Sequence, residues 1–375
     1  MGEVIILNEK LDGSKPIKLS STRAWRTYIG GKLLEGLLGE ENPTDSHFPE
    51  EWIMSVVSAR NKGREDIVDE GLSKVDIHDV QLTLKSLIEN DPEGFLGGTH
   101  VKEFSVKTGV LVKIIDAAER LTVQVHPDRI KARELFNSEY GKTEAWHILG
   151  GREIEGEPPH VYLGFKPGVT KEKWKQLFEK QDIQGMLDCM HKYYVEPGNT
   201  FLIEAGTPHA IGAGCLLVEI QEPTDFTIRI EKTTPQGFTL DDFMCHQGIG
   251  FEKMFECFTY ANYTREETLN KWKITPTQIT ETNGNKEFEL IGYNNIPYFK
   301  MNLLEVNDEM KIEGNNVFYG LLVVSGIGSI ISGEDEQSLT QGNQFFIPAK
   351  VSSVTLRNTG EESLKVMRLF GPQVI

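Results

Sequence analysis

Residues 195–230 read VEPGNTFLIEAGTPHAIGAGCLLVEIQEPTDFTIRI, and this stretch decides the class of fold. Short apolar runs alternate with Gly and Pro, a pattern that is typical of consecutive β-strands joined by tight turns. We expect three short strands and two turns here, with a strand at 200–203. The second turn, at 204–208, places His209 at the start of the next strand. A histidine held at a strand start by a rigid turn is a candidate ligand.

The rest of the chain extends this β pattern and interrupts it with helices. Apolar runs predict strands at 51–60, 110–115 and 121–125, followed near the carboxyl terminus by the strand segments FYGLLVVSGIGSIISG, SLTQGNQFFIPAK, SSVTLRN and LKVMRLF. Helical spacing of apolar residues predicts helices at about 76–90, 128–137 and 171–190, and a short helix at 240–244.

Polar, linker-like sequence at 264–273 and 280–286 suggests a boundary between two domains. We place the first domain at residues 1–262, with helical insertions at about 76–90 and 128–190. The second domain, residues 263–375, is expected to be a compact antiparallel sandwich or barrel. The predicted fold class is therefore mainly β with helical insertions.

Two segments share one pattern of turn residues, from Gly198 to His209 and from Gly342 to Ser353. In each, a glycine is followed by five residues, a turn, and two more residues before the final position. The pattern is similar to the second motif of the cupin superfamily, G(x)5PxG(x)2H. Glu204 replaces Pro in the first copy, and Lys350 and Ser353 replace Gly and His in the second. The resemblance implies two cupin-type (jelly-roll) β-barrels, the second of them degenerate and metal-free.

Size and charge limit the classes of function. The chain has 375 residues, and its 39 basic and 56 acidic side chains give a net charge of −17. This charge repels nucleic acids and anionic membranes, so a phosphorylated ligand needs a local basic pocket. The amino-terminal apolar run is too short for a signal peptide, and no segment approaches the length of a membrane span. We expect a cytoplasmic protein without nucleic-acid or membrane partners, and the sequence leaves its oligomeric state open.

Candidate metal ligands come from three separate segments. The four cysteines show no paired spacing, so a metal would be held by nitrogen and oxygen. In LTVQVHPD, Gln124 and His126 lie two residues apart on one strand face, while GKTEAWHIL supplies Glu144 and the opening turn supplies His209. Each residue alone is more often a packed or solvated side chain. Together, two imidazoles, a carboxylate and an amide oxygen suit zinc, with one position left for water or substrate.

The motifs QVHPD, GKTEAW, GTPHAIGAG and EIQEPTD, followed by Arg229, resemble in the same order those of type I mannose-6-phosphate isomerases of the cupin superfamily. The resemblance spans nearly the whole chain. It implies one Zn²⁺ per chain, held by Gln124, His126, Glu144 and His209, and active-site positions at Lys142, Glu219, Asp225 and Arg229. It also implies interconversion of mannose 6-phosphate and fructose 6-phosphate, by proton transfer between C1 and C2 through a cis-enediol.

The residues at these positions have chemistry that fits the implied reaction. Arg229 can stabilise an enediolate or shuttle a proton, and Asp225, four residues earlier, can orient its guanidinium. Lys142 is a cation for sugar oxygens or phosphate, and Glu219 is a candidate acid or base. The alternative interpretations are an ordinary Asp225–Arg229 ion pair and a solvated Lys142. Further basic candidates for phosphate, each interpreted instead as a surface charge, are Arg23, Arg26, Lys32 and Lys350.

Three other classes of protein compete with the isomerase. A non-catalytic sugar-phosphate-binding cupin would not need both Lys142 and Arg229 beside a full set of ligands. An iron-dependent cupin dioxygenase typically presents three histidines and a carboxylate or a facial triad, whereas two histidines occupy motif positions here. A DNA-binding regulator is disfavoured by the net charge and by the lack of a recognisable helix-turn-helix.

Overall fold

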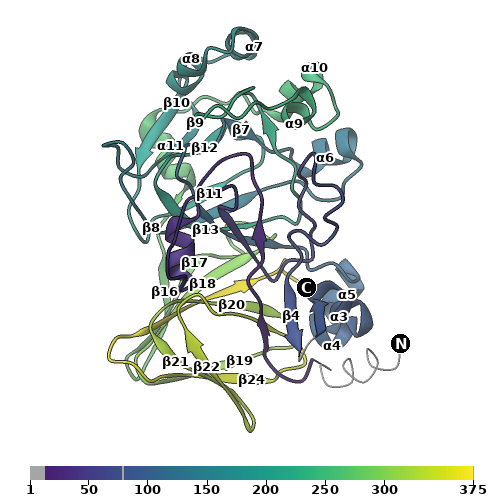
Figure 1. Ribbon diagram of the computed structural model, residues 1–375, viewed down its shortest axis with the longest axis vertical. Coiled ribbons are helices and arrows are strands. Elements are labelled where there is room, and N and C mark those ends of the chain that lie inside the picture. Colours follow the sequence, from purple (N-terminus) through teal and green to yellow (C-terminus); the bar gives the residue numbers. More distant parts are fainter. Residues whose placement is uncertain (1–12, 78–79, 375) are drawn as a thin grey trace.

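The computed structural model describes residues 13–77 and 80–374. Its strands form four large sheets and one hairpin, arranged as two double-layered units stacked end to end (Figure 1). We call them the N-terminal β unit and the C-terminal β unit. The mainly β class that the sequence predicts is confirmed, and the cupin fold is consistent with this arrangement. No helix among the described residues is long and apolar enough to cross a membrane.

The N-terminal β unit consists of a seven-stranded and a five-stranded sheet. In spatial order, the seven-stranded sheet contains β15 (Lys273–Ile274), β11 (Thr200–Ile203), β8 (Glu144–Gly151), β13 (Cys215–Gln221), β6 (Leu111–Asp116), β3 (Glu50–Ile53) and β2 (Arg23–Ala24). The five-stranded sheet contains β10 (Met190–Tyr194), β9 (His160–Phe165), β12 (His209–Ile211), β7 (Gln124–Val125) and β14 (Ile228–Arg229).

The C-terminal β unit consists of a seven-stranded and a four-stranded sheet. The larger sheet contains β1 (Ile17–Leu19), β23 (Gln344–Ile347), β20 (Tyr319–Ser325), β25 (Leu364–Phe370), β18 (Lys300–Val306), β17 (Asn285–Ile291) and β16 (Thr277–Thr282). The smaller contains β19 (Glu309–Glu313), β24 (Ser353–Asn358), β21 (Ile327–Ser332) and β22 (Asp335–Thr340). β1, near the start of the chain, lies in the C-terminal β unit, whereas β15, which follows residue 262, lies in the N-terminal β unit. The chain therefore crosses between the two units after β1 and again after β15. The domain boundary at 262/263 stays a prediction.

Helices cover the outer face of the five-stranded sheet and one flank of the stack (Figure 1). Over the sheet lie α7 (Lys171–Lys180), α8 (Ile183–Asp188), α9 (Asp242–His246), α10 (Phe251–Met254) and the 3₁₀ turn η1 (Phe255–Cys257). The others are α2 (Lys32–Leu37), α3 (Leu84–Asn90), α4 (Pro92–Leu96), α5 (Gly98–Phe104), α6 (Arg129–Phe136) and α11 (Arg265–Trp272). The hairpin is formed by β4 (Lys74–Ile77) and β5 (Val80–Thr83).

The central strands of the two seven-stranded sheets, such as β13, β6 and β23, are buried on both faces, whereas the edge strand β16 is exposed along its length. Val218 of β13 packs into a core shared with Met367 of β25, whereas its neighbour Leu217 packs into the interior of the N-terminal β unit. Strand alternation therefore sends every second side chain of β13, β6 and β8 into that interior. This alternation directs Lys113 and Glu219 to the same face as Leu217.

Several predicted elements differ from the structure. The helix predicted at 76–90 is wrong over its first half, where β4 and β5 form a hairpin and α3 begins only after its N-cap, Thr83. Positions 78–79 lie outside the described residues. The strand predicted at 51–60 ends at Ile53, because Met54 takes a left-handed conformation with φ 45°. The insertion at 128–190 is only partly helical, since β8 and β9 lie between α6 and α7.

The two predicted linkers are also regular structure. The segment 264–273 is mostly α11, which starts with a reciprocal capping box between Thr264 and Glu267. The segment 280–286 closes the β16–β17 hairpin, with Asn283 and Gly284 both at positive φ. In each case a specific cap or turn motif outweighs the polar composition.

The repeated turn pattern corresponds to repeated structure. Gly198 and Gly342 have similar backbone conformations, with φ of 90° and 84°, which favour glycine. Each precedes a strand, a turn and a strand that lies in the opposite sheet of the same unit: β11 and β12 in one, β23 and β24 in the other. At the end of the second copy Val354 packs into the core, so its neighbour Ser353 lies on the other face of β24.

Candidate metal centre and its pocket

Three strands deliver a His–Glu–His group to the interior of the N-terminal β unit. His209 begins β12, His126 directly follows β7, and Glu144 begins β8 in the facing sheet. Their potential ligand atoms all lie within 4.8 Å of one another. Each of the three residues is at most 1% exposed, so the group is enclosed by protein.

Backbone carbonyls fix the orientation of both imidazoles. His126 Nδ1 lies 2.8 Å from the Phe226 carbonyl oxygen, and His209 Nδ1 lies 2.9 Å from that of Thr207. A proton on each Nδ1 satisfies these carbonyls and leaves the Nε2 lone pairs directed at Glu144, at 3.2 and 3.4 Å. Burial lowers the pKa of both histidines, that of His126 to about 3, so the rings are neutral and able to bind a metal.

Glu144 is ionised at the centre of this group. Burial raises the pKa of Glu144, but the ammonium group of Lys142 and then His126 lower it well below its usual range. Lys142 Nζ lies 2.8 Å from Glu144 Oε2 and 2.9 Å from His126 Nε2. Glu144 Oε2 is nevertheless buried without a hydrogen bond of normal geometry. Two imidazole nitrogens and an under-coordinated carboxylate oxygen are donors that suit a divalent ion such as zinc.

Gln124 lies beside the His–Glu–His group. It pairs with His209 on one side and Arg229 on the other in the five-stranded sheet, and it is 7% exposed. Its amide nitrogen is 3.3 Å from His209 Nε2. The amide is therefore within reach of the group, and its role as a ligand stays a prediction.

A close backbone approach places Lys142. A Cβ atom on Gly141 would lie 2.7 Å from the Pro127 carbonyl oxygen and 2.8 Å from the carbonyl carbon of Asp128, so no side chain fits there. The next amide, that of Lys142, donates to the Pro127 carbonyl at 3.0 Å. Lys142 is 3% exposed, so the interpretation of it as a solvated surface lysine is wrong.

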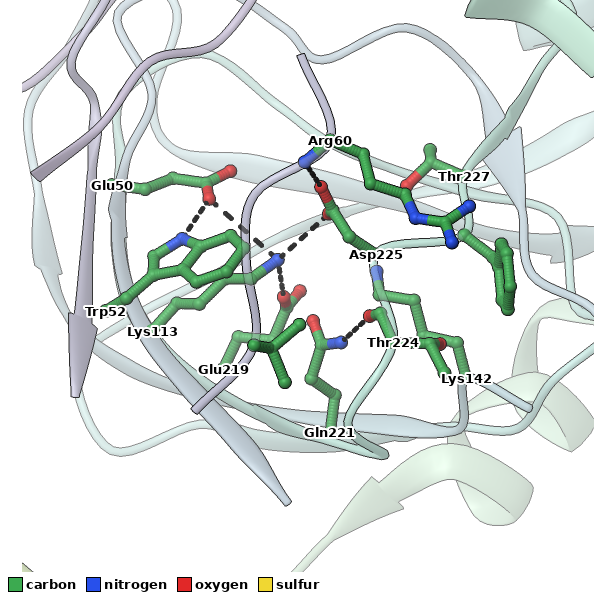
Figure 2. Close-up of polar contacts among 12 residues, drawn as sticks. Glu50, Trp52, Arg60, Lys113, Lys142, Glu219, Gln221, Thr224, Asp225 and Thr227 are labelled. Carbon is green, nitrogen blue, oxygen red and sulfur yellow. Dashed lines mark hydrogen bonds and ion pairs between the residues drawn. The ribbon is translucent and has the colours of Figure 1, made fainter. Parts of the chain in front are cut away.

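A buried charge network lies in the pocket that Lys142 also lines (Figure 2). Lys113 Nζ is 3.3 Å from Glu219 Oε1, 3.8 Å from Glu50 Oε2 and 4.0 Å from Asp225 Oδ1. The indole of Trp52 donates to Glu50 at 2.7 Å, and the ammonium of Lys113 lies 5.1 Å from the centre of its ring. Burial alone would lower the pKa of Lys113, but the carboxylates of Glu50 and Glu219 raise it, so the amine stays charged.

Arg26 completes the network from the amino-terminal segment. Its two Nη atoms lie 3.2 and 3.3 Å from the carboxylate oxygens of Asp225, and its Nε lies 2.8 Å from Glu50 Oε2. Burial raises the pKa of Asp225, but Arg26 and Lys113 outweigh this and hold it at about 2. Arg26 is 5% exposed, so its interpretation as a surface charge is wrong.

Arg229 has partners other than Asp225. Its Nη1 donates to the carbonyl oxygen of Met244 at 3.0 Å and more weakly to that of Thr227 at 3.4 Å. The prediction that Asp225 orients the Arg229 guanidinium is therefore wrong, because the Asp225 carboxylate is taken by Arg26 and by the Arg60 amide at 3.0 Å. Half-buried Arg229 lines the same pocket as Asp225 and Lys142.

Glu219 is the carboxylate in this pocket with an elevated pKa. Burial raises the pKa of Glu219, and the nearby negative charge of Glu144 raises it further. The indole of Trp146 bridges the two carboxylates, donating at 3.1 Å to Glu144 Oε1 and to Glu219 Oε2. A buried carboxyl group with a raised pKa is suited to proton transfer near neutral pH.

The buried ion pairs of Arg26 lead to a stability prediction. Among the described residues, Arg26→Met would leave buried Asp225 and Glu50 with Lys113 as their one cationic partner, so we expect a loss of about 3–5 kcal/mol in the free energy of unfolding. The control is Arg357→Met. That arginine pairs with Glu309 and Glu336, but its side chain is 40% exposed, so we expect a cost below about 1 kcal/mol. Denaturant unfolding of both variants tests this, and equal costs would contradict it.

The structure thus brings all eight sequence-predicted site residues to one region. Four lie at the metal group (Gln124, His126, Glu144, His209), and Lys142 links that group to a pocket lined also by Glu219, Asp225 and Arg229. Their individual roles stay predictions. Sequence reasoning missed Glu50 and Lys113 and interpreted Arg26 as a surface charge, whereas all three line the same pocket. A lysine inside the apolar run VLVKIID was the available signal, since a charge on a fully buried strand needs partners.

Comparisons with known proteins agree with this arrangement. Residues 291–364 match the family model described as "Mannose-6-phosphate isomerase, cupin domain". The chain is 29% identical over 282 residues to "Probable mannose-6-phosphate isomerase GmuF" of Bacillus subtilis, covering 74% of this chain and 80% of that protein. It is 26% identical over 255 residues to "Mannose-6-phosphate isomerase ManA" of the same organism, covering 67% and 73%.

Solved structures show the same fold. The mannose 6-phosphate isomerase from Bacillus subtilis superposes with a TM-score of 0.72 at 21% identity, covering 94% of this chain and 99% of that one. A mutant phosphomannose isomerase from Salmonella typhimurium superposes with a TM-score of 0.70 at 17% identity, covering 96% and 100%. At these identities the likeness concerns the fold.

Fold, site and relatives together define an isomerase of the cupin superfamily with a possible metal-binding group. The comparisons support a type I mannose-6-phosphate isomerase, because the chain is similar to the family model over residues 291–364 and to relatives of that name over most of its length.

Proposed function

We propose that this isomerase interconverts mannose 6-phosphate and fructose 6-phosphate and depends on one Zn²⁺ per chain. The observation that carries the proposal is the buried group of His126, Glu144 and His209, which Lys142 links to the pocket that it lines together with Arg229. Names of relatives supply the substrate, and the donor set supports zinc. When bound, the metal would supply Lewis acidity toward oxygens of the sugar.

The pocket is lined by basic side chains that can bind a phosphate group and by carboxylates that can bind sugar hydroxyls. Four basic side chains (Arg26, Lys113, Lys142, Arg229) and three carboxylates (Glu50, Glu219, Asp225) line it. Arg26, Lys113 and Lys142 form ion pairs with carboxylates. Among the described residues, Arg229 donates hydrogen bonds only to backbone carbonyls. Arg229 is therefore the cation with the most remaining capacity for substrate.

The proposed reaction moves one proton between neighbouring carbons. A base removes the C2 proton of the open-chain aldose while the C1 carbonyl oxygen gains a proton, which gives a cis-enediol. Return of a proton to C1, with loss of the proton on the C2 hydroxyl, gives the ketose. Glu219 is our candidate for the base because its pKa is raised. Lys142 and Arg229 would stabilise negative charge that develops on the two oxygens.

All four cysteines are buried free thiols, which supports a reducing compartment and hence the cytoplasm. A test of the substrate is a coupled assay of purified protein with mannose 6-phosphate, and with glucose 6-phosphate for comparison. We expect fructose 6-phosphate to form from mannose 6-phosphate. Binding of mannose 6-phosphate without turnover would instead favour a non-catalytic sugar-phosphate-binding cupin.

A further inference from the structure

A second polar cavity lies in the C-terminal β unit, outside the pocket described above. Its volume is about 410 Å³, and its walls come from the end of the larger sheet, from α4 and α5, and from residues 371–374. Among its lining residues are Arg368, Asn302, Lys300, Glu287 and Tyr293. None of the residues that line it lines the metal-site pocket or belongs to the metal group.

Arg368 and Asn302 interrupt the apolar interior of this unit. Along β25 the inward side chains are Leu364, Val366 and Phe370, and the alternation places Arg368 on the same face. Along β18 the same alternation places Asn302 in line with the inward side chain of Leu304. Arg368 and Asn302 are direct partners in the ladder, so a guanidinium and an amide face the interior side by side.

Arg368 is a buried cation with an incomplete set of partners. It is 9% exposed, its Nη2 donates to the Glu313 carbonyl at 2.9 Å, and its Nε is buried with no hydrogen bond. The rings of Tyr319 and Phe370 lie 4.2 and 4.7 Å from the guanidinium carbon. Among the residues that the structure describes, no carboxylate oxygen lies within 4.0 Å of it. The Glu287 carboxylate in the same wall acts on the Arg368 charge from beyond ion-pair distance, so among the described residues no counter-ion is in contact with this buried guanidinium, which favours a bound anion.

Asn302 offers a further unused group. Its amide nitrogen donates to Glu287 at 2.5 Å, which fixes the orientation of the amide. The amide oxygen is buried and accepts no hydrogen bond from any residue that the structure describes. The same bond takes one oxygen, Oε1, of the Glu287 carboxylate, and Glu287 forms no ion pair within 4.0 Å of Arg368 among the described residues. The amide oxygen can accept a hydroxyl or amine hydrogen from a ligand.

We propose that this cavity, which we call the Arg368 cavity, binds a small molecule through a carboxylate or phosphate group. The planar guanidinium donates to such an oxyanion, and Asn302 Oδ1 accepts a hydrogen bond from the rest of the ligand. Lys300 adds a second cation to the wall, with its ammonium 3.0 Å from Glu289. A volume of 410 Å³ lies within the range of small-molecule sites. The proposal does not depend on the substrate of the isomerase.

Calorimetric titration of the intact protein with inorganic phosphate and, separately, with malonate tests the proposal. We expect wild-type protein to show one binding event with at least one of the two probes. Arg368→Gln should weaken the affinity of this event roughly ten- to hundredfold, because a charged donor is lost. The matched control, Arg357→Gln, changes an exposed arginine of the same unit and should keep that event. The preferred probe distinguishes phosphate from carboxylate ligands.

Phosphate can also bind in the isomerase pocket. The binding event that tests the proposal is therefore the one whose affinity Arg368→Gln weakens. A second variant, Lys300→Met, leaves the buried arginine in place and should weaken the same event if Arg368→Gln fails to fold. Identical isotherms for wild type and the variants, or no heat from either probe with wild-type protein, would overturn the proposal. Isomerase turnover is expected to survive Arg368→Gln.

Discussion

Replacing His209 with alanine is expected to remove the bound metal and to lower the isomerase rate by about 10³-fold or more. His209 is 1% exposed and contributes one of only two imidazoles to the metal group. Its loss leaves Glu144 and His126, with Gln124, as the nearby donors, a set too small for a tight site. A metal that acts as a Lewis acid contributes several kcal/mol to the lowering of the barrier, which corresponds to this change in rate.

The matched control for this variant is His147→Asn. His147 lies on β8 three residues after Glu144 and is also buried, with its Nδ1 2.9 Å from the hydroxyl of Thr200. It does not belong to the metal group. Elemental analysis should therefore find metal in the His147→Asn protein and little in the His209→Ala protein. Full metal content in a folded His209→Ala protein would refute the assignment of the ligands.

Arg229→Ala is expected to lower kcat by about 10²–10³-fold while metal content and thermal stability stay near the wild-type values. The guanidinium donates to the carbonyl oxygen of Met244 and lines the pocket with no carboxylate partner among the described residues, so its removal takes away a preorganised positive charge. Because this charge acts on the transition state, kcat should fall more than KM rises.

Arg229→Lys separates charge from geometry at the same position. Lysine keeps the positive charge but cannot donate to the backbone and to substrate through one planar fork, so we expect a partial recovery of kcat. Steady-state kinetics of wild type, Arg229→Ala and Arg229→Lys provide the comparison. An unchanged rate in folded, metal-loaded Arg229→Ala would show that Arg229 has no part in the chemistry.

The sequence was most informative where local motifs determine structure. The turn before His209 and the strand at 200–203 could be predicted, because Gly and Pro spacing leaves few backbone conformations. The helix at 128–137 could be predicted from Pro127, which can open a helix, and in the structure Asp128 is its N-cap. The same turn pattern also indicated the second β unit through the repeat at Gly342.

Sequence reasoning failed where long-range contacts decide the outcome. The pairing of Asp225 with Arg26, 199 positions earlier, is set by the packing of the amino-terminal segment against β3 and β6. Proximity in sequence suggested instead that Arg229 is the partner of the Asp225 carboxylate. The hairpin before α3 was missed because Val80, Leu82 and Leu84 fit a strand period as well as Val80, Leu84 and Leu87 fit a helical one.

The central claim is that His126, Glu144 and His209 hold a metal that turnover of mannose 6-phosphate requires. The most direct measurement is the isomerase rate of one protein sample before chelation, after complete chelation and after addition of one equivalent of Zn²⁺, with metal content determined at each stage. We expect the rate to fall with the metal and to return with it, reaching its maximum at one zinc per chain. Undiminished turnover in the metal-free sample would contradict the claim.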